Sequence, residues 1–155
     1  MKIKALLIAI AVVVGSVAVQ AQEQMFERFS KNNDISTVFI SKALLSMAGN
    51  MDMGGANIKS LSNKLERMEI YSSENKAATA LMKVEAGKIA SDKAFEVLMT
   101  VKDKGDHITF YAKRNKGDSF KDLIMVINDT DECTIIRIVG TFTMEDIQGV
   151  MGDKK

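Results

Sequence analysis

The pattern of apolar and polar positions divides the chain into a helix-rich first half and a strand-rich second half. In the second half, four runs of strand-forming residues follow one another, separated by turn residues such as Asp, Asn, Lys and Gly. These runs cover residues 95–101, 108–113, 123–128 and 133–139. Because short connections join consecutive strands, the pattern predicts an antiparallel meander over about residues 95–139.

Two of these runs also predict which faces are buried. Phe95, Val97, Met99 and Val101 occupy alternate positions and are predicted to share one face of their strand. The run from Leu123 to Asn128 is apolar at successive positions, which predicts a central strand that is covered on both sides.

The first half predicts two further strands and most of the helices. Residues 35–40 are β-branched and aromatic, as in a strand. Residues 67–72 alternate, with Met68 and Ile70 on one face and Arg67, Glu69 and Tyr71 on the other, which predicts a half-buried strand. Helices are predicted over 24–31, 42–48 behind Ser41 as N-cap, 58–64 behind Asn57, 73–89 and 144–150 behind Thr143. The helix at 73–89, capped by Ser72 or Ser73, is predicted to bury Ala77, Ala78, Leu81 and Val84.

These elements predict an α+β fold with a single domain over residues 22–155. Its centre is a mixed, mainly antiparallel sheet of five or six strands, with the C-terminal four-strand meander and helices packed on it. A parallel pair formed by a right-handed crossover in the first half stays open, and the order of the strands is not readable from the sequence.

The first 21 residues have the pattern of a secretory signal peptide. Two lysines precede ten apolar residues, Ala5–Val14, and small residues lead to a cleavage site between Ala21 and Gln22. The apolar run is far shorter than the ~20 residues that a transmembrane helix needs. We therefore expect a protein without a transmembrane anchor, located in the periplasm or secreted. Loss of Lys2 and Lys4 with this segment turns the net charge from +1 to −1, which disfavours nucleic acid as a partner.

The chain offers few residues for catalysis or for a cofactor. His107 is the only histidine and follows a turn, and Cys133 is the only cysteine and lies in an apolar run, where we expect it to be buried. A Ser–His–Asp or Cys–His site would have to use His107, which has no suitable nucleophile near it in the sequence. A zinc site needs three or four ligands, whereas the chain offers one His and one Cys. Asp129 and Asp131 resemble the start of a calcium loop, but Gly and Glu are missing at the required later positions, so a hairpin turn is predicted. We predict no catalytic residues and no cofactor.

A methionine-rich segment is the most unusual local feature. Met47, Met51 and Met53 lie within a stretch that ends in Gly54-Gly55. Thioethers bind Cu(I), so the three methionines are a candidate for a copper site. Methionine also forms adaptable contact surfaces, so the same three residues are a candidate contact site for a partner.

Four segments together resemble a known family, the domain-of-unknown-function family four-two-five-two of small exported Bacteroidota proteins. They are residues 37–45 (TVFISKALL), 95–102 (FEVLMTVK), 122–126 (DLIMV) and 138–147 (IVGTFTMEDI). The resemblance implies a location in the cell envelope and a link to gene neighbourhoods of extracytoplasmic-function sigma factors. It implies no established activity and no catalytic residues.

Three classes of function stay open. The first is a non-enzymatic envelope protein that binds a protein partner, with a role in envelope stress signalling. The second is a carrier of a small apolar ligand on an apolar face of the sheet. The third is a hydrolase that uses carboxylates alone.

Overall fold

The computed structural model of the protein describes residues 22–48 and 62–151. The chain divides between Asn33 and Asp34 into two compact units. In the first unit, a helix covers residues 22–31, close to the predicted 24–31. On this helix the rings of Phe26 and Phe29 meet edge to face, with their centroids 6.2 Å apart.

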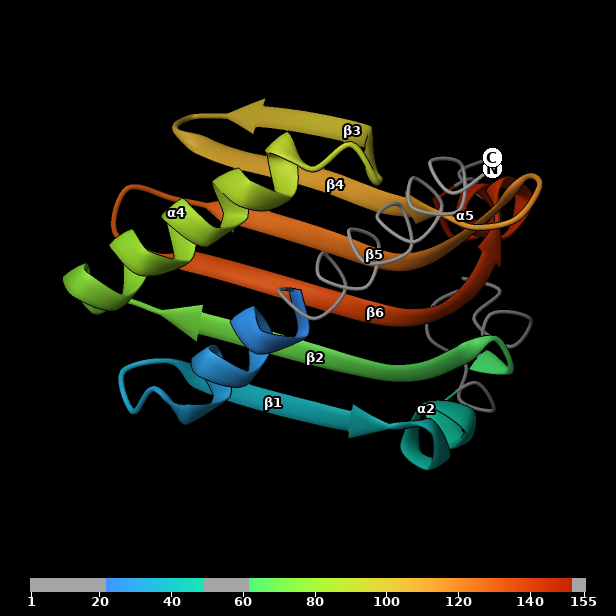
Figure 1. Cartoon of the computed structure of the whole chain (residues 1–155), viewed down its shortest axis with the longest axis horizontal. Helices are drawn as coiled ribbons and strands as arrows, with labels where there is room; N and C mark the ends of the chain where they lie inside the picture. The colour runs from blue at the N-terminus through green and yellow to red at the C-terminus, as the bar shows by residue number, and fades with distance from the viewer. Residues whose placement is uncertain (1–21, 49–61, 152–155) are drawn as a thin grey trace, which may run out of the picture. The chain divides into compact units, whose positions relative to one another are not determined.

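The second unit is an α+β domain built on one antiparallel sheet (Figure 1). Its strands lie in the order β1-β2-β6-β5-β4-β3, so the predicted meander β3–β6 is confirmed. The parallel pair that the sequence left open does not occur among the described strands, because β2 runs antiparallel to both β1 and β6. The elements are β1 (Ser36–Ser41), α2 (Lys42–Ala48), β2 (Leu65–Ser73), α4 (Lys76–Ser91), β3 (Phe95–Asp103), β4 (Asp106–Arg114), β5 (Ser119–Asn128), β6 (Cys133–Thr143) and α5 (Met144–Met151).

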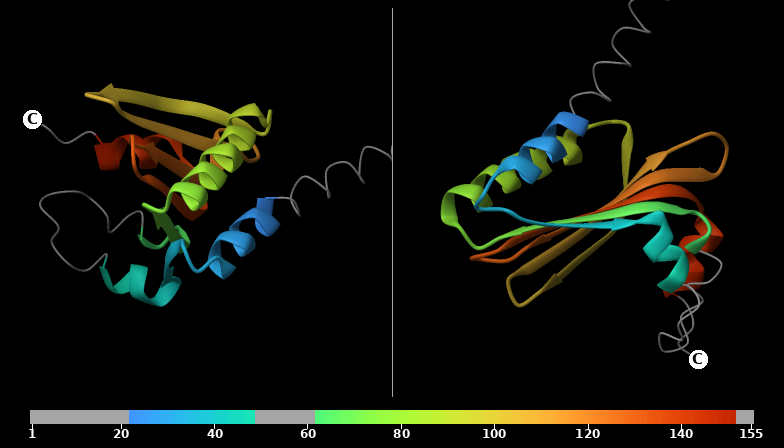
Figure 2. Two further views of the ribbon diagram at one scale, coloured as in Figure 1. Left: turned by 90° about the vertical axis from the view of Figure 1, so that its left-hand side faces the viewer. Right: turned by 90° about the horizontal axis from the view of Figure 1, so that it is seen from below.

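Helices lie on both sides of this sheet. Helix α4 lies on one side, which we call the α4 face, and α2 and α5 lie on the other side, which we call the open face (Figure 2). On the α4 face, Ile124, Val126 and Ile135 are buried. On the open face, α2 and α5 cover one end of the sheet, where a buried cluster of Leu45, Leu65 and Phe142 packs against Ile40, Met68, Leu123, Ile138 and Ile147.

Helix α4 begins later than predicted and buries a different stripe. β2 continues through Ser73, whose hydroxyl donates to the carbonyl of Asp34 at 2.6 Å, so Asn75 is the N-cap instead. The Oδ1 of Asn75 accepts from two backbone N–H groups at 3.0 and 3.1 Å. The predicted stripe was wrong except at Ala78, since Leu81 and Val84 are 41% and 61% exposed. The buried residues are Ala78, Thr79, Met82, Glu85, Ala86 and Ile89, which follow helical spacing in another phase.

A bulge breaks the predicted face of β3. Val97 pairs with Tyr111 and Met99 pairs with Phe110, so Leu98 is an extra residue between two consecutive pairs. An extra residue reverses the alternation of side chains beyond it. Val97 therefore lies on the α4 face, where it is 59% exposed, and Met99 lies on the open face. The prediction that these residues share one face was wrong for this reason.

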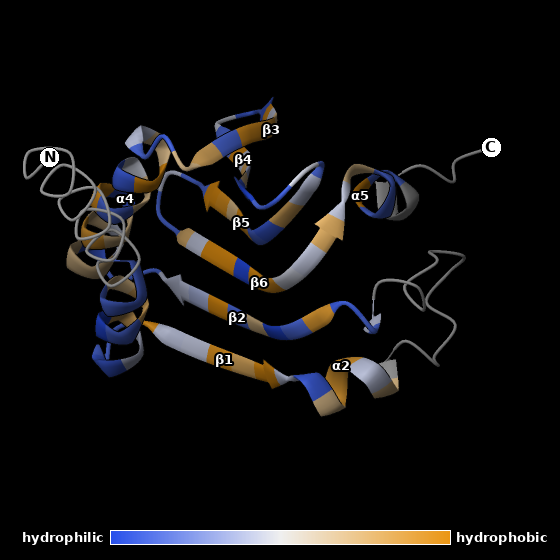
Figure 3. Cartoon of the chain, turned by 45° about the vertical axis from the view of Figure 1, so that its right-hand side comes forward, coloured by the Kyte–Doolittle hydropathy of each residue, from blue (hydrophilic) through white to orange (hydrophobic). Residues whose placement is uncertain are grey.

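Strands β2 and β5 differ from their predicted burial in a related way. β2 is half-buried as predicted, but its buried side carries Glu69 and Tyr71. β5 is central as predicted, with Ile124 and Val126 buried on the α4 face. The prediction that β5 is covered on both sides was wrong for Met125 and Ile127, which are only half-buried on the open face. Figure 3 shows where apolar and polar residues lie along the strands.

One glycine permits a close approach of two backbone segments. A Cβ atom on Gly140 would lie 2.3 Å from the backbone oxygen of Lys64 and 2.7 Å from the Cζ of Phe142. The same Lys64 oxygen accepts a hydrogen bond from the N–H of Thr141 at 3.3 Å. Gly140 thus lets β2 enter the sheet beside the buried cluster under α2 and α5.

Candidate functional site

A continuous row of apolar residues crosses the open face. Each strand of the sheet contributes one residue, and each residue is directly opposite the next in the strand pairing. Directly paired residues point to the same face and lie within about 4.5–5.5 Å of each other at Cα. We call this the apolar row; in strand order it consists of Val38, Ile70, Ile136, Met125, Phe110 and Met99.

A second, shorter row widens this surface over three strands. Ile127, Ile108 and Val101 are paired with one another across β5, β4 and β3. We call these three residues together with the apolar row the apolar patch. Val38 and Val101 are 47% and 39% exposed, and the other members are half-buried. The patch therefore offers apolar area to a molecule that docks on the open face.

Carboxylates form the end of the open face that lies farthest from α2 and α5. Asp106 is the first residue of β4, directly after the β3–β4 turn, and Asp129 and Glu132 come from the β5–β6 turn. Together with Ile127 and Thr134 they line a hollow of about 280 Å³. These two turns share one end of the sheet because successive turns of a meander lie at alternate ends. We call Asp106, Asp129 and Glu132 the acidic rim.

Most of the nearby lysines are directed to the other face. Lys102 is paired with His107, which belongs to the α4 face. The Nζ of Lys83, on α4, donates to the backbone oxygen of Asp129 at 2.9 Å and not to a carboxylate of the rim. The Oε1 of Glu132 accepts from the hydroxyl of Thr134 at 3.0 Å. The acidic rim thus gives this end of the open face a negative charge.

The α4 face differs from the open face because it buries charges. Glu69 is 8% exposed, and its carboxylate accepts from the Nε of Arg67 at 2.7 Å and from the hydroxyl of Tyr71 at 3.0 Å. Arg137, which is 2% exposed, lies 3.5 Å from Glu69 and 3.7 Å from Asp122. Buried charges are retained when partners of opposite charge and hydrogen bonds compensate for the lost hydration. This explains why the polar side of β2 is the buried side.

The two residues that were weighed for catalysis lie at one end of the α4 face. Asn128 stands between them, opposite His107 on one side and Cys133 on the other. The Sγ of Cys133 donates to the Oδ1 of Asn128 at 3.3 Å. Cys133 is buried, as predicted, and burial raises the pKa of its thiol to about 11. The thiol is therefore protonated at neutral pH, which does not suit a nucleophile.

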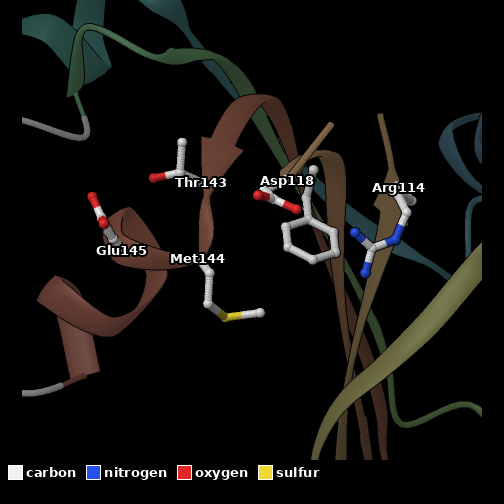
Figure 4. Close-up of a pocket in the computed structure, with 6 residues that line it drawn as sticks. Arg114, Asp118, Thr143, Met144 and Glu145 are labelled. Atoms are coloured by element: carbon white, nitrogen blue, oxygen red, sulfur yellow. The ribbon is translucent and has the colours of Figure 1, made fainter. Parts of the chain in front are cut away.

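A hollow of about 420 Å³ lies at the opposite end of the sheet (Figure 4). Arg114 lies on one side of it, and Met144 and Glu145 from the start of α5 lie on the other. The guanidinium of Arg114 binds both carboxylate oxygens of Glu96, at 2.9 and 2.8 Å, and lies 5.0 Å from the ring centre of Phe120. The hydrogen bonds from Arg114 lower the pKa of Glu96. This ion pair joins β4 to β3 and stabilises their hairpin. The guanidinium of Arg114 therefore already has a partner within the protein.

The methionine candidates are only partly within the structure. Met47 lies in α2 and is 67% exposed, whereas Met51 and Met53 lie outside the described residues. The cleavage site is at the limit of the description, since Gln22 is the first described residue and Ala21 lies outside it. Within residues 22–48 and 62–151 there is no cluster of three His, Cys, Asp or Glu side chains that is suited to a metal. The copper site and the methionine contact site stay predictions.

Reasoning from the sequence missed the apolar row and the acidic rim. The alternation in each strand signals part of the row, for example at Ile108 and Phe110. The pairing of neighbouring strands and the bulge in β3 decide which residues complete the row, and neither is readable from one sequence.

The fold and this surface place the protein in the class of small α+β domains with one antiparallel sheet. One face of this sheet is apolar and partly uncovered. A family model described as a domain of unknown function (DUF4252) matches residues 28–150, so the chain belongs to this family. No curated protein and no solved structure gives a significant match to the chain. No helix in the described part of the chain is long and apolar enough to span a membrane.

Proposed function

We propose that the protein is a non-enzymatic binding protein of the cell envelope that holds an amphipathic segment of a partner protein on the apolar patch. The observation that carries the proposal is the apolar row, which runs unbroken across all six strands of the open face. The signal-peptide pattern of the first 21 residues supports a role after export. A role in envelope stress signalling belongs to the same proposal and is supported by the family resemblance.

The charge of the acidic rim and the methionine side chains of the apolar row favour a basic amphipathic segment. Its apolar side chains would contact the patch, and basic side chains would lie beside the acidic rim of Asp106, Asp129 and Glu132. Met99 and Met125 lie within the row, and methionine side chains adapt readily to different apolar surfaces. A basic amphipathic segment of a protein satisfies both properties.

The same observations favour a protein partner over the other two classes of function. A carrier of a small apolar ligand encloses most of its ligand within a cavity. The residues of the apolar patch instead lie half-exposed on an open sheet. The protonated, buried thiol of Cys133 supports a role without catalysis.

Binding can be tested with a fluorescent synthetic peptide of alternating leucine and lysine, titrated against the purified protein and followed by anisotropy. Two valines of β3 provide a matched pair, since both are exposed but Val101 is on the open face and Val97 is on the α4 face. We expect Val101→Asn to weaken binding about tenfold, or ~1.4 kcal/mol, and Val97→Asn to leave it within about twofold.

A second peptide separates the charge from the apolar contact. Leucine alternating with glutamate should bind less tightly than leucine with lysine, and the difference should shrink as salt is added. Equal effects of the two valine variants, or no binding of the lysine peptide, would contradict the proposal.

A further inference from the structure

The outer edge of β1 lacks the features that keep the edges of sheets from pairing. β1 ends the sheet on one side, and no other strand in the described part of the chain pairs with its outer edge. Its sequence, STVFIS, contains no charged residue, and its pairing with β2 contains no bulge. Val38 and Phe39 are 47% and 62% exposed. An edge of this kind readily accepts another strand.

The opposite edge of the sheet is protected. β3 carries Glu96, Lys102 and Asp103, and the bulge at Leu98 interrupts its alternation. Charged residues and bulges both hinder pairing with a further strand. The contrast singles out β1 as the edge that is open to association.

We propose that β1 pairs antiparallel with β1 of a second copy of the protein, across a twofold axis perpendicular to the sheet. Such an axis keeps the α4 face of both copies on the same side. Directly opposed residues in an antiparallel pair point to the same face. The two residue numbers of each opposed pair must therefore add up to an even number. At the centre of the pairing, one residue of β1 then faces the same residue of the second copy.

Charge complementarity selects one of these pairings. When Val38 faces Val38 of the second copy, Lys42, the first residue of α2 beyond one end of β1, comes close to Asp34 of the second copy, in the turn before the other end. The twofold axis repeats this attraction at both ends of the pair. When Phe39 faces its counterpart instead, Lys42 comes close to Ser36 of the second copy and no charges of opposite sign meet. The pairing centred on Val38 is therefore the one we propose.

This pairing also continues the pattern of the open face. Val38 is the outermost member of the apolar row, so its contact with Val38 of the second copy joins the two rows end to end. On the α4 face, the ring of Phe39 comes opposite Thr37 of the second copy. Both faces of β1 thus gain apolar contacts without bringing like charges together.

The expected dimer is reversible. A stable interface typically involves about 20–30 residues on each side, whereas β1 supplies six with a few flanking residues. We expect the apparent mass to rise from monomer toward dimer with concentration. The inference does not depend on the proposed function, because it concerns the edge of the sheet and not the binding of a partner on its face.

Disulfide formation tests the pairing directly. In the proposed dimer, Val38→Cys places two cysteines opposite each other at a Cα separation of about 4.5–5.5 Å, within the range that a disulfide spans. Ser36→Cys is the matched control in the same strand, since Ser36 would face Ile40 of the second copy and the two cysteines would be about 13 Å apart. The native Cys133 is buried and does not compete.

Under mild oxidation, Val38→Cys should form a covalent dimer at least about tenfold faster than Ser36→Cys. Equal rates would overturn the proposed pairing. Sedimentation of Phe39→Lys adds a second measurement: it should remain monomeric where the wild type and Val97→Lys associate, because a lysine at the edge hinders pairing. A monomeric wild type at every concentration, or unchanged association of Phe39→Lys, would overturn the proposal.

Discussion

Replacing Gly140 by alanine tests how β2 is held beside β6. The added Cβ would lie 2.3 Å from the Lys64 oxygen and 2.7 Å from the Cζ of Phe142. A carbon and a carbonyl oxygen in contact normally lie at least about 3.3 Å apart. The backbone of Lys64 must therefore move by about 1 Å, and this movement breaks the 3.3 Å hydrogen bond from Thr141.

The expected loss of stability follows from these two effects. Forcing extra volume into a packed region costs about 1–3 kcal/mol, and losing a hydrogen bond costs about 1 kcal/mol more. We therefore expect Gly140→Ala to lower the free energy of unfolding by about 2–4 kcal/mol. Unfolding in urea, followed by circular dichroism with linear extrapolation, measures this free energy.

Gly87 provides the matched control for this substitution. It lies in α4, and a Cβ at this position would meet nothing within 4 Å. Alanine favours a helix over glycine, so Gly87→Ala should raise the free energy of unfolding by about 0.5–1 kcal/mol. If Gly140→Ala unfolds at the same urea concentration as the wild type, the close approach of Lys64 to β6 is refuted.

Two further predictions concern buried groups on the α4 face. Glu69→Ala should destabilise the fold by about 3 kcal/mol because Arg137 loses a buried counter-charge. Glu66→Ala, at an exposed position of the same strand, should change stability by less than about 0.5 kcal/mol in the same urea assay. Similar losses of stability in the two variants would contradict the buried network. The folded pKa of Cys133 is raised from 9.0 to about 11, so the stability that its protonated thiol contributes is fully present below pH 9 and is lost as the pH rises toward 11. The stability of the wild type relative to Cys133→Ala should therefore fall by about 2–3 kcal/mol over this range, and parallel pH curves for the two proteins would refute this.

Local patterns predicted the elements well but predicted their faces poorly. The strands from β3 to β6, the Ser41-initiated helix α2 and the final helix α5 all follow from runs and turns that neighbouring residues determine. Which face of a strand is buried depended on interactions with neighbouring strands. The bulge at Leu98 reversed the side of Met99, and Arg137 on β6 made it favourable to bury Glu69 on β2.

The candidate site was the least predictable part for the same reason. The row from Val38 to Met99 exists only because β2 lies between β1 and β6, an order that brings Ile70 opposite Ile136. The acidic rim was also missed, although the predicted meander places its two turns at one end of the sheet. The sequence pointed to methionine instead, because methionine-rich segments are visible without any knowledge of pairing.

The central claim is that a partner segment docks on the apolar patch. Methyl NMR of protein labelled at isoleucine and methionine, titrated with the leucine–lysine peptide, tests this most directly. Neighbouring residues on opposite faces provide internal controls: Met125 and Ile136 lie on the open face, whereas Ile124 and Ile135 lie on the α4 face. We predict that the methyl signals of Met125 and Ile136 shift progressively with added peptide while those of Ile124 and Ile135 stay nearly unchanged. Shifts that are equal on both faces, or larger on the α4 face, would contradict the proposed binding surface.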